Sequence, residues 1–280
     1  MSGFIYRNQS TENIIGRRLI LCSFDGAVSS ITGVQRQNQI GEVTITRHIP
    51  NEYGVINSNL QFQYSLTLDP CYKDAAPFIT NEEQIVIERW LTSPKFSSDL
   101  YIINDNDEIT CTYCGKFTET TWIPSREGFS GVTFTFENNS AYAKEHREFT
   151  FSSETNNWSF VLDCDSDELE EYVYPVITFI NPNNTTEIKI TNHTDIGEIN
   201  NNTLNVEKDI PLIMDCRHCI LTNGVTNGTF SFDDVGWADV GNIYWPRLMP
   251  GENEIWIDKP CTIKVSYDVV RKKVGGWLND

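Results

Sequence analysis

The chain has 280 residues, which is enough for one large β domain or for two domains of about 100–150 residues each. Hydrophobic residues make up 39% of it and aromatic residues 12%, so it can bury a core, and global disorder is excluded. The formal net charge of −18 disfavours binding to nucleic-acid phosphates, because such binding depends on clustered Lys and Arg. The acidic balance indicates a solvated, negatively charged surface.

No run of about 18 apolar residues is present, so no membrane-spanning helix is expected. Residues 1–18 lack the apolar segment of a signal peptide, and we expect synthesis in a cytoplasm without secretion. The eight cysteines are therefore expected to be reduced thiols and not a disulfide framework.

Short strands dominate the first half of the chain. Leu19–Phe24 is an apolar run followed by Asp25 and Gly26, which predicts a buried strand that ends in a turn. Apolar side chains alternate along the next run, which places Phe62, Tyr64, Leu66 and Leu68 on the core face of a strand. Further strands are predicted at residues 100–103 and 109–117, which flank a polar turn at 104–107, and at 131–136.

One helix is predicted in this half, over residues 81–92. Thr80 and Glu83 form a capping box, in which the Thr80 hydroxyl accepts from the Glu83 amide and the Glu83 carboxylate accepts from the Thr80 amide. Ile87, Trp90 and Leu91 continue an apolar stripe, with Val86 beside it. Pro94 ends the helix, because proline disfavours helical geometry in the residue before it. Strands with one helix indicate an α+β domain.

The pattern changes at the charged segment Lys144–Glu148, which we interpret as a linker. Short strands separated by Asn, Gly and Asp turns follow it, which is typical of a sandwich or jelly roll. The strands are predicted at residues 158–162, 173–180, 186–191, 204–206, 212–214, 219–221, 229–232, 254–257 and 262–270. The sequence thus predicts a mainly β protein with domains at residues 1–147 and 148–280.

Two CxxC pairs suggest a zinc site, but the spacing argues against it. Cys111 and Cys114 fall in a predicted strand, where residues three apart point to opposite faces. About a hundred residues separate them from Cys216 and Cys219, against about 15–20 in common zinc ribbons. Cys216 and Cys219 flank a segment that could be a tight turn and includes His218, so metal binding by this second pair stays open.

No catalytic motif is present: the chain has no phosphate loop, HExxH, nucleophile elbow or dinucleotide fingerprint. The four histidines, His48, His146, His193 and His218, have no visible partner cluster. Asp163–Asp167 begins like a calcium loop, but the required glycine position holds Glu168 and the twelfth position holds Tyr174. We therefore expect no catalytic, cofactor-binding or metal-binding residues and no enzymatic activity. A sandwich-fold hydrolase ranks last, because adjacent acids such as Glu170 and Glu171 do not make a cleft.

Tryptophans in the second half offer another function. Trp237, Trp245 and Trp256 could stack on sugar rings in a carbohydrate-binding module that recognises cell-wall polysaccharide. Core packing explains Trp256 equally well, because its strand needs a large side chain on one face, and Trp245 is better interpreted as packing.

The segment Trp245–Ile257 reads as a hairpin. Pro250 and Gly251 suit the two central positions of a type II turn, and Asn253, Ile255 and Ile257 then share one strand face, with Glu254 and Trp256 on the other. This segment resembles the last hairpin of the phage distal tail protein (Dit) family. Other anchors of the resemblance follow in the family's order: Leu19–Gly26, Phe62–Leu66, Phe78–Glu83 leading to Arg89–Leu91, Tyr113–Phe117, Phe134–Glu137, Tyr174–Ile177, Ile190–Asn192 and Ile213–Cys216.

The resemblance spans roughly residues 4–267. It implies a belt-forming N-terminal domain, a C-terminal galectin-like β-sandwich, and a hexameric ring in the virion at the distal end of the tail. The expected partners are further copies of the chain, the major tail tube protein and the tail-tip or baseplate proteins, without cofactors. An acidic surface fits a lumen through which DNA slides without specific binding. No insertion the size of a sugar-binding module interrupts the chain, which puts direct receptor binding in doubt.

Overall fold

The structure is a computed structural model that describes residues 3–22, 35–40, 52–69, 77–104, 106, 108–180, 186–197, 200–208, 210–222 and 243–272. It is mainly β, as the sequence predicted, and it divides into two compact units. The first comprises Met1–Glu145 and Arg271–Asp280, and the second comprises His146–Val270. The second unit is therefore inserted into the first, and the chain passes between them along two strands, β10 (Ala143–Ser153) and β18 (Cys261–Arg271).

Two groups of strands in the first unit meet along β8 (Ile109–Pro124). The first half of β8 pairs with β7 (Ser98–Ile103), which continues through β1 (Gly3–Tyr6) to β2 (Gln9–Ser10). Its second half pairs with β9 (Phe129–Asn138), which continues through β6 (Gln61–Leu68) to β3 (Leu19–Cys22). All these pairs are antiparallel.

Gly115 lies where β8 passes from one group to the other. It pairs with Ser98 of β7 and with Asn138 of β9. A Cβ atom at this position would lie 2.1 Å from the Glu137 carbonyl oxygen, which no side chain can tolerate. The close approach of β9 therefore explains why glycine stands at the crossing.

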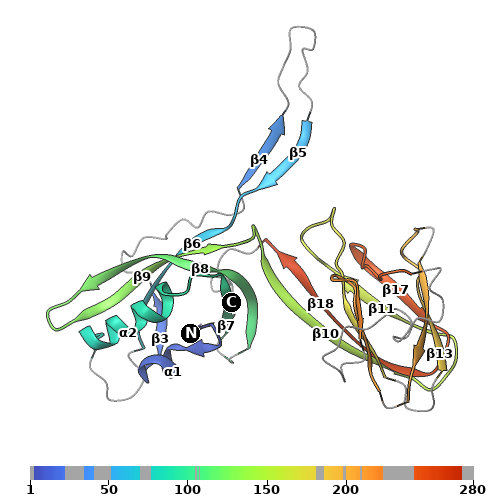
Figure 1. The fold of residues 1–280 in the computed structure, drawn as a ribbon. Helices are drawn as coiled ribbons and strands as arrows, with labels where there is room; N and C mark the ends of the chain where they lie inside the picture. The colour runs from blue at the N-terminus through green and yellow to red at the C-terminus, as the bar shows by residue number, and fades with distance from the viewer. Residues whose placement is uncertain are drawn as a thin grey trace, which may run out of the picture. The chain divides into compact units, whose positions relative to one another are not determined.

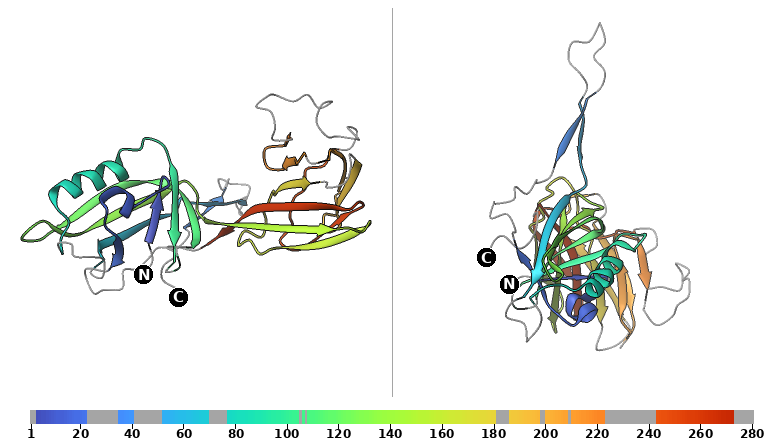
Figure 2. Two further views of the ribbon diagram at one scale, coloured as in Figure 1. Left: turned by 90° about the horizontal axis from the view of Figure 1, so that it is seen from below. Right: turned by 90° about the vertical axis from the view of Figure 1, so that its left-hand side faces the viewer.

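The predicted helix is α2 (Asn81–Thr92), with the predicted ends and the predicted capping box. The Thr80 hydroxyl accepts from the Glu83 amide at 3.2 Å, and the Glu83 carboxylate accepts from the Thr80 amide at 2.8 Å. Arg17 reinforces the cap with a 2.9 Å ion pair to Glu83. The buried face of the helix lies against the sheet (Figure 2), through Ile87, Trp90 and Leu91.

A second, short helix, α1 (Thr11–Ile15), was not predicted. Its cap uses Ser10 and Asn13 in place of the usual Glu or Gln, and it ends at Gly16, whose φ of 68° is left-handed. The core-face prediction for β6 is confirmed, since Phe62, Tyr64, Leu66 and Leu68 are all buried. The turn expected at Asp25 and Gly26 lies outside the described residues.

β4 (Arg36–Ile40) and β5 (Glu52–Asn57) form a two-stranded antiparallel ribbon, which we call the arm. Figures 1 and 2 show the arm standing away from the other strands of the first unit. Its base is tied by a hydrogen bond from the Asn57 side-chain amide to the Tyr142 hydroxyl.

The second unit consists of two antiparallel sheets that share one core (Figure 1). One sheet has the order β16-β15-β12-β18-β10, and the other has the order β11-β17-β13-β14. The new strands are β11 (Trp158–Cys164), β12 (Val176–Ile180), β13 (Thr186–Asn192), β14 (Asn201–Val206), β15 (Leu212–Asp215), β16 (Ile220–Thr222) and β17 (Gly251–Ile257). This is a β-sandwich, one of the two architectures predicted for this half. The strand predicted at residues 229–232 lies outside the described residues.

The charged segment 144–148 contains the boundary between the two units, as a linker would, but it is a strand and not an irregular connection. It belongs to β10, and its charged side chains are paired with residues far along the sequence. The pairs are Glu145 with Arg271, His146 with Asp268, Arg147 with Asp165 and Glu148 with Lys264, at 2.7–2.9 Å. The neighbouring strand β18 supplies three of these four partners, which a local pattern does not reveal.

The hairpin predicted at Trp245–Ile257 is also wrong in part. β17 begins at Gly251, whose φ of 90° fits the positive φ expected after Pro250. β17 pairs with β11 and β13, however, and the residues before the turn contribute only an isolated bridge between Leu248 and Val173. The predicted face of β17 is confirmed, since Asn253, Ile255 and Ile257 are at most 2% exposed.

Candidate functional site

The cysteines singled out in the sequence are dispersed. Cys111 is buried in the core of the first unit, while Cys114 is half-buried, and burial raises the pKa of its thiol. Cys216 is buried in the core of the second unit, and Cys219 is exposed at the end of the turn that follows β15. Within the described ranges, no three His, Cys, Asp or Glu side chains gather into a metal-binding group.

The described histidines and loop acids have separate structural partners. His146 pairs with Asp268, and His218 pairs with Asp215, each at 2.8 Å. The resemblance of Asp163–Asp167 to a calcium loop is superficial, because Asp165 pairs with Arg147 and Ser166 is buried. His48 lies outside the described residues.

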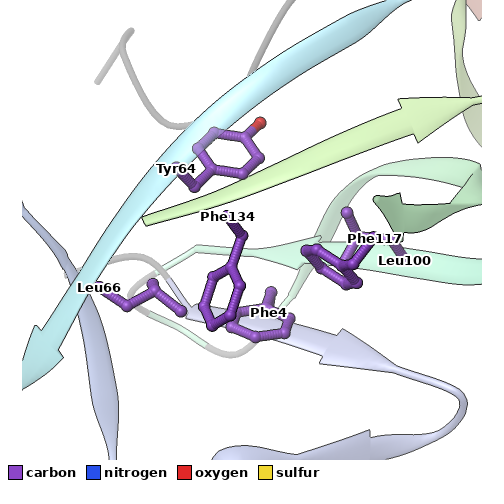
Figure 3. Close-up of a pocket in the computed structure, with 6 residues that line it drawn as sticks. All are labelled: Phe4, Tyr64, Leu66, Leu100, Phe117 and Phe134. Atoms are coloured by element: carbon purple, nitrogen blue, oxygen red, sulfur yellow. The ribbon is translucent and has the colours of Figure 1, made fainter. Parts of the chain in front are cut away.

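A small cavity in the first unit is apolar. It measures about 10 Å³ and is lined by Phe4, Tyr64, Leu66, Leu100, Phe117 and Phe134. Figure 3 shows five hydrocarbon side chains and one tyrosine around it, with the Tyr64 hydroxyl directed away from the others. A space of this size without a convergent polar group is a packing gap in a core, not a ligand site.

The tryptophans occupy different environments. Trp245 is partly buried and packs against the core of the second unit, as its interpretation as packing predicted. Trp256 is partly exposed on the outer face of β17, opposite the buried Ile255 and Ile257, and its ring lies 6.3 Å from that of His193. Trp237 lies outside the described residues.

The second unit contains a polar cluster around Asp195, which sequence reasoning missed. Asp195 is 1% exposed and accepts hydrogen bonds from Arg247 at 2.8 and 3.1 Å, from the Tyr244 hydroxyl at 2.8 Å and from the Gly197 amide at 3.2 Å. The Arg247 hydrogen bonds are the main reason why the pKa of Asp195 lies below its usual range, although burial opposes them. The Arg247 guanidinium also lies 4.1 Å from the centre of the Tyr172 ring.

Three buried asparagines form hydrogen bonds with the backbone of the segment that precedes β17. The Asn202 side chain donates to the carbonyl oxygen of Tyr244 and accepts from its amide. The Asn253 side chain does the same with Met249, at 2.7 and 2.8 Å. Asn192 donates to the Arg247 carbonyl oxygen at 2.9 Å. These amides satisfy backbone groups that strand pairing leaves without partners. The cluster is a structural brace, and it has no nucleophile beside a general base.

The arm exposes three large apolar side chains. Ile40, Tyr53 and Ile56 are 56%, 67% and 51% exposed. A two-stranded ribbon alone is marginally stable in water, because it has no second layer on which to bury its side chains. The arm is therefore a candidate assembly surface, with Ile56 on the face of the ribbon opposite Ile40 and Val55.

The outer face of α2 is apolar as well. Val86, expected beside the buried stripe, is 41% exposed, and its neighbour Ile85 is 54% exposed. The outer face of a surface helix is normally polar, and β-branched residues are not favoured helix formers. The face formed by Glu82, Ile85, Val86 and Arg89 is thus a second candidate assembly surface, which the helical spacing could have revealed.

Family comparison identifies the class of the chain, which is that of the phage tail proteins. A model described as a phage tail protein N-terminal domain matches residues 1–140, and one described as a phage tail C-terminal domain matches residues 141–267. The chain belongs to this family of phage tail proteins, DUF6558. It is a structural component of the virion and not an enzyme. No curated protein matches its sequence significantly.

Solved structures show the same fold over nearly the whole chain. The Dit protein (gp 19.1) of phage SPP1, described as a paradigm of the hub adsorption apparatus in phages that infect Gram-positive bacteria, is 13% identical, with a TM-score of 0.61. The match covers 96% of this chain and 99% of that one. A chain of the phage P2 baseplate, in its activated conformation with calcium, is 11% identical, with a TM-score of 0.52, over 98% of this chain and all of that one. The predicted resemblance to the distal tail proteins is confirmed.

No helix in the described part of the chain is long and apolar enough to span a membrane.

Proposed function

We propose that the protein is a distal tail hub: a hexameric ring that joins the tail tube of a long, non-contractile phage tail to the tail tip or baseplate. The observation that carries the proposal is the match in fold to the SPP1 Dit protein over 96% of this chain, in a member of a phage tail protein family. The ring would lie at the distal end of the tail in the virion, after synthesis in the host cytoplasm.

The two units would have different roles in the ring. The first unit, residues 1–145 with 271–280, would form the ring, or belt, and the second unit, residues 146–270, would be the galectin-like sandwich. A closed ring needs head-to-tail contacts between two different patches of each subunit. The arm and the outer face of α2 are two such patches, and both lie in the first unit.

The partners of the ring would be the major tail tube protein on one side and tail-tip or baseplate proteins on the other. The net charge of −18 suits a lumen that DNA traverses without adsorbing, because phosphates are repelled by an acidic wall.

Light scattering and negative-stain electron microscopy of the purified full chain test the proposal. We expect a species with the mass of a hexamer, alone or after mixing with the tail tube protein, and ring images with a central pore. A strict monomer at high concentration that never forms rings beside tail proteins would overturn it.

A carbohydrate-binding role is the second candidate, and one observation favours it. Trp256 is partly exposed on the outer face of β17, and the ring of His193, just beyond the end of β13, lies 6.3 Å from it, as a platform for a sugar ring requires. This role predicts saturable binding to cell-wall polysaccharide that Trp256→Ala abolishes. Trp245 is partly buried, so Trp245→Ala serves as the control. Wild-type binding by Trp245→Ala and loss of binding by Trp256→Ala would support this role. Absence of binding by the wild type would exclude it.

A further inference from the structure

We propose that the arm of one copy docks on the outer face of α2 in the next copy, with Arg36 paired to Glu82 across the contact. This inference rests on the proposed ring, and it names the two surfaces that close it.

The outer face of α2 has the composition of a contact surface. Glu82, Ile85, Val86 and Arg89 are spaced by three and four residues, so they share one face of the helix. This is the face opposite Ile87, Trp90 and Leu91, which are buried in the core of the first unit. It therefore presents two exposed branched apolar side chains between an acidic and a basic residue.

One face of the arm carries both a basic residue and apolar residues. In β4, Arg36, Asn38 and Ile40 lie on one face, because strand side chains alternate. The strand register places Val55 opposite Asn38, so Val55 joins that face. Tyr53 adds an aromatic ring that is 67% exposed at the register shift between β4 and β5.

The spacing between the charged and the apolar residues is similar on the arm and on α2. Val55 lies opposite Asn38, which is about 7 Å from Arg36 along the ribbon. Ile85 and Val86 lie three and four residues from Glu82 in α2, which is about 4.5 and 6 Å along the helix axis. Pairing Arg36 with Glu82 therefore brings Val55 over Ile85 and Val86, with Ile40 further along the helix.

The charges of Arg36 and Glu82 also favour the contact. Glu83, the neighbour of Glu82, is occupied by Arg17 and by the helix cap. Neither Arg36 nor Glu82 has an ion-pair partner among the described residues of its own chain. Copies with a net charge of −18 repel one another, so a basic residue on one patch and an acidic residue on the other favour head-to-tail pairing.

The contact predicts a charge-swap result in the full chain. We expect Arg36→Glu and Glu82→Arg each to raise the protein concentration at half-assembly at least about tenfold, because each puts like charges together and changes the association free energy by about 1.4 kcal/mol. The double variant should return to within about threefold of wild type, because the pair is restored in reverse. Glu170→Arg, an exposed site in the second unit, serves as the control for adding positive charge. Circular dichroism checks that every variant is folded.

A photoreactive phenylalanine analogue in place of Tyr53 gives a second measurement. Irradiated rings should yield an inter-subunit crosslink that mass spectrometry places in residues 81–92. A crosslink only to another tail protein, or to another part of the neighbouring copy, would overturn the inference.

The outcomes separate the two proposals. Assembly of the wild type with unchanged single variants, or single defects that the double variant does not repair, would refute the arm contact and leave the hub function standing. Failure of the wild type to assemble, alone and with tail proteins, would refute both.

Discussion

Asp195 shows how much of the second unit depends on one buried carboxylate. Replacing Asp195 with Ala removes the acceptor for the buried Tyr244 hydroxyl and for Arg247. We expect the free energy of unfolding to fall by about 2–4 kcal/mol, less than for a fully buried ion pair, because the Arg247 side chain is 32% exposed. Asp163→Ala, at an exposed position of β11, should change it by less than about 0.5 kcal/mol. Urea denaturation measures both, and equal losses would contradict the role given to Asp195.

The same residue predicts a pH dependence. The pKa of Asp195 is lowered in the folded chain, mainly by the hydrogen bonds from Arg247, so the unfolded chain binds this proton at higher pH than the folded chain. The stability contributed by the carboxylate is therefore complete above its unfolded pKa of about 3.9 and is lost as the pH falls through the lower folded value. The difference in unfolding free energy between wild type and Asp195→Asn should be constant from about pH 5 to 7 and shrink below about pH 4. A difference that persists at low pH would show that shape, not charge, makes Asp195 important.

At the scale of elements, α2 is held in place by its N-terminal cap. Thr80→Ala removes the hydroxyl that accepts from the Glu83 amide, and we expect a loss of about 1 kcal/mol in unfolding free energy. Hydrogen exchange should also quicken at the amides of the first helical turn. Thr92→Ala, at the exposed end of the same helix, should be nearly neutral, because alanine's higher helix propensity offsets the bond from Thr92 to the Glu88 carbonyl oxygen. A larger effect at Thr92 than at Thr80 would contradict this assignment.

The elements that the sequence predicted well are those with local causes. The cap at Thr80, the alternation in β6 and the positive φ of Gly251 each depend on residues a few positions apart, so the local sequence is enough to predict them. β10 was not predicted as a strand because its acidic side chains are neutralised by Arg271 and Lys264, more than a hundred residues away.

The candidate surfaces were predictable only in part. The spacing of Ile85 in α2 places it on the outer face, so the helix pattern already contained that surface. Nothing in the local sequence marks Asp195 as buried, because its partners Tyr244 and Arg247 lie 49 and 52 residues away. The local sequence does not mark the arm as exposed either, because its exposure depends on whether other strands pack against it.

At the scale of the whole molecule, the net charge of −18 opposes any assembly of identical copies. The repulsion acts over the Debye length, which falls from about 30 Å at 0.01 M salt to about 8 Å at 0.15 M. A contact such as Arg36 with Glu82 acts over a few ångströms and is screened much less. Salt should therefore weaken the long-range repulsion more than the short-range attraction.

We accordingly expect the fraction of protein in rings, at fixed protein concentration, to rise between about 10 and 150 mM sodium chloride. Analytical ultracentrifugation across this range measures it, and sucrose at equal osmolality controls for general exclusion effects. In Arg36→Glu the local contact is repulsive, so added salt should recover part of the lost assembly and narrow the gap to wild type. If instead wild-type rings dissociate as salt is added, short-range ion pairs would dominate over the net charge, and the ring would be held together by many more of them than the arm supplies.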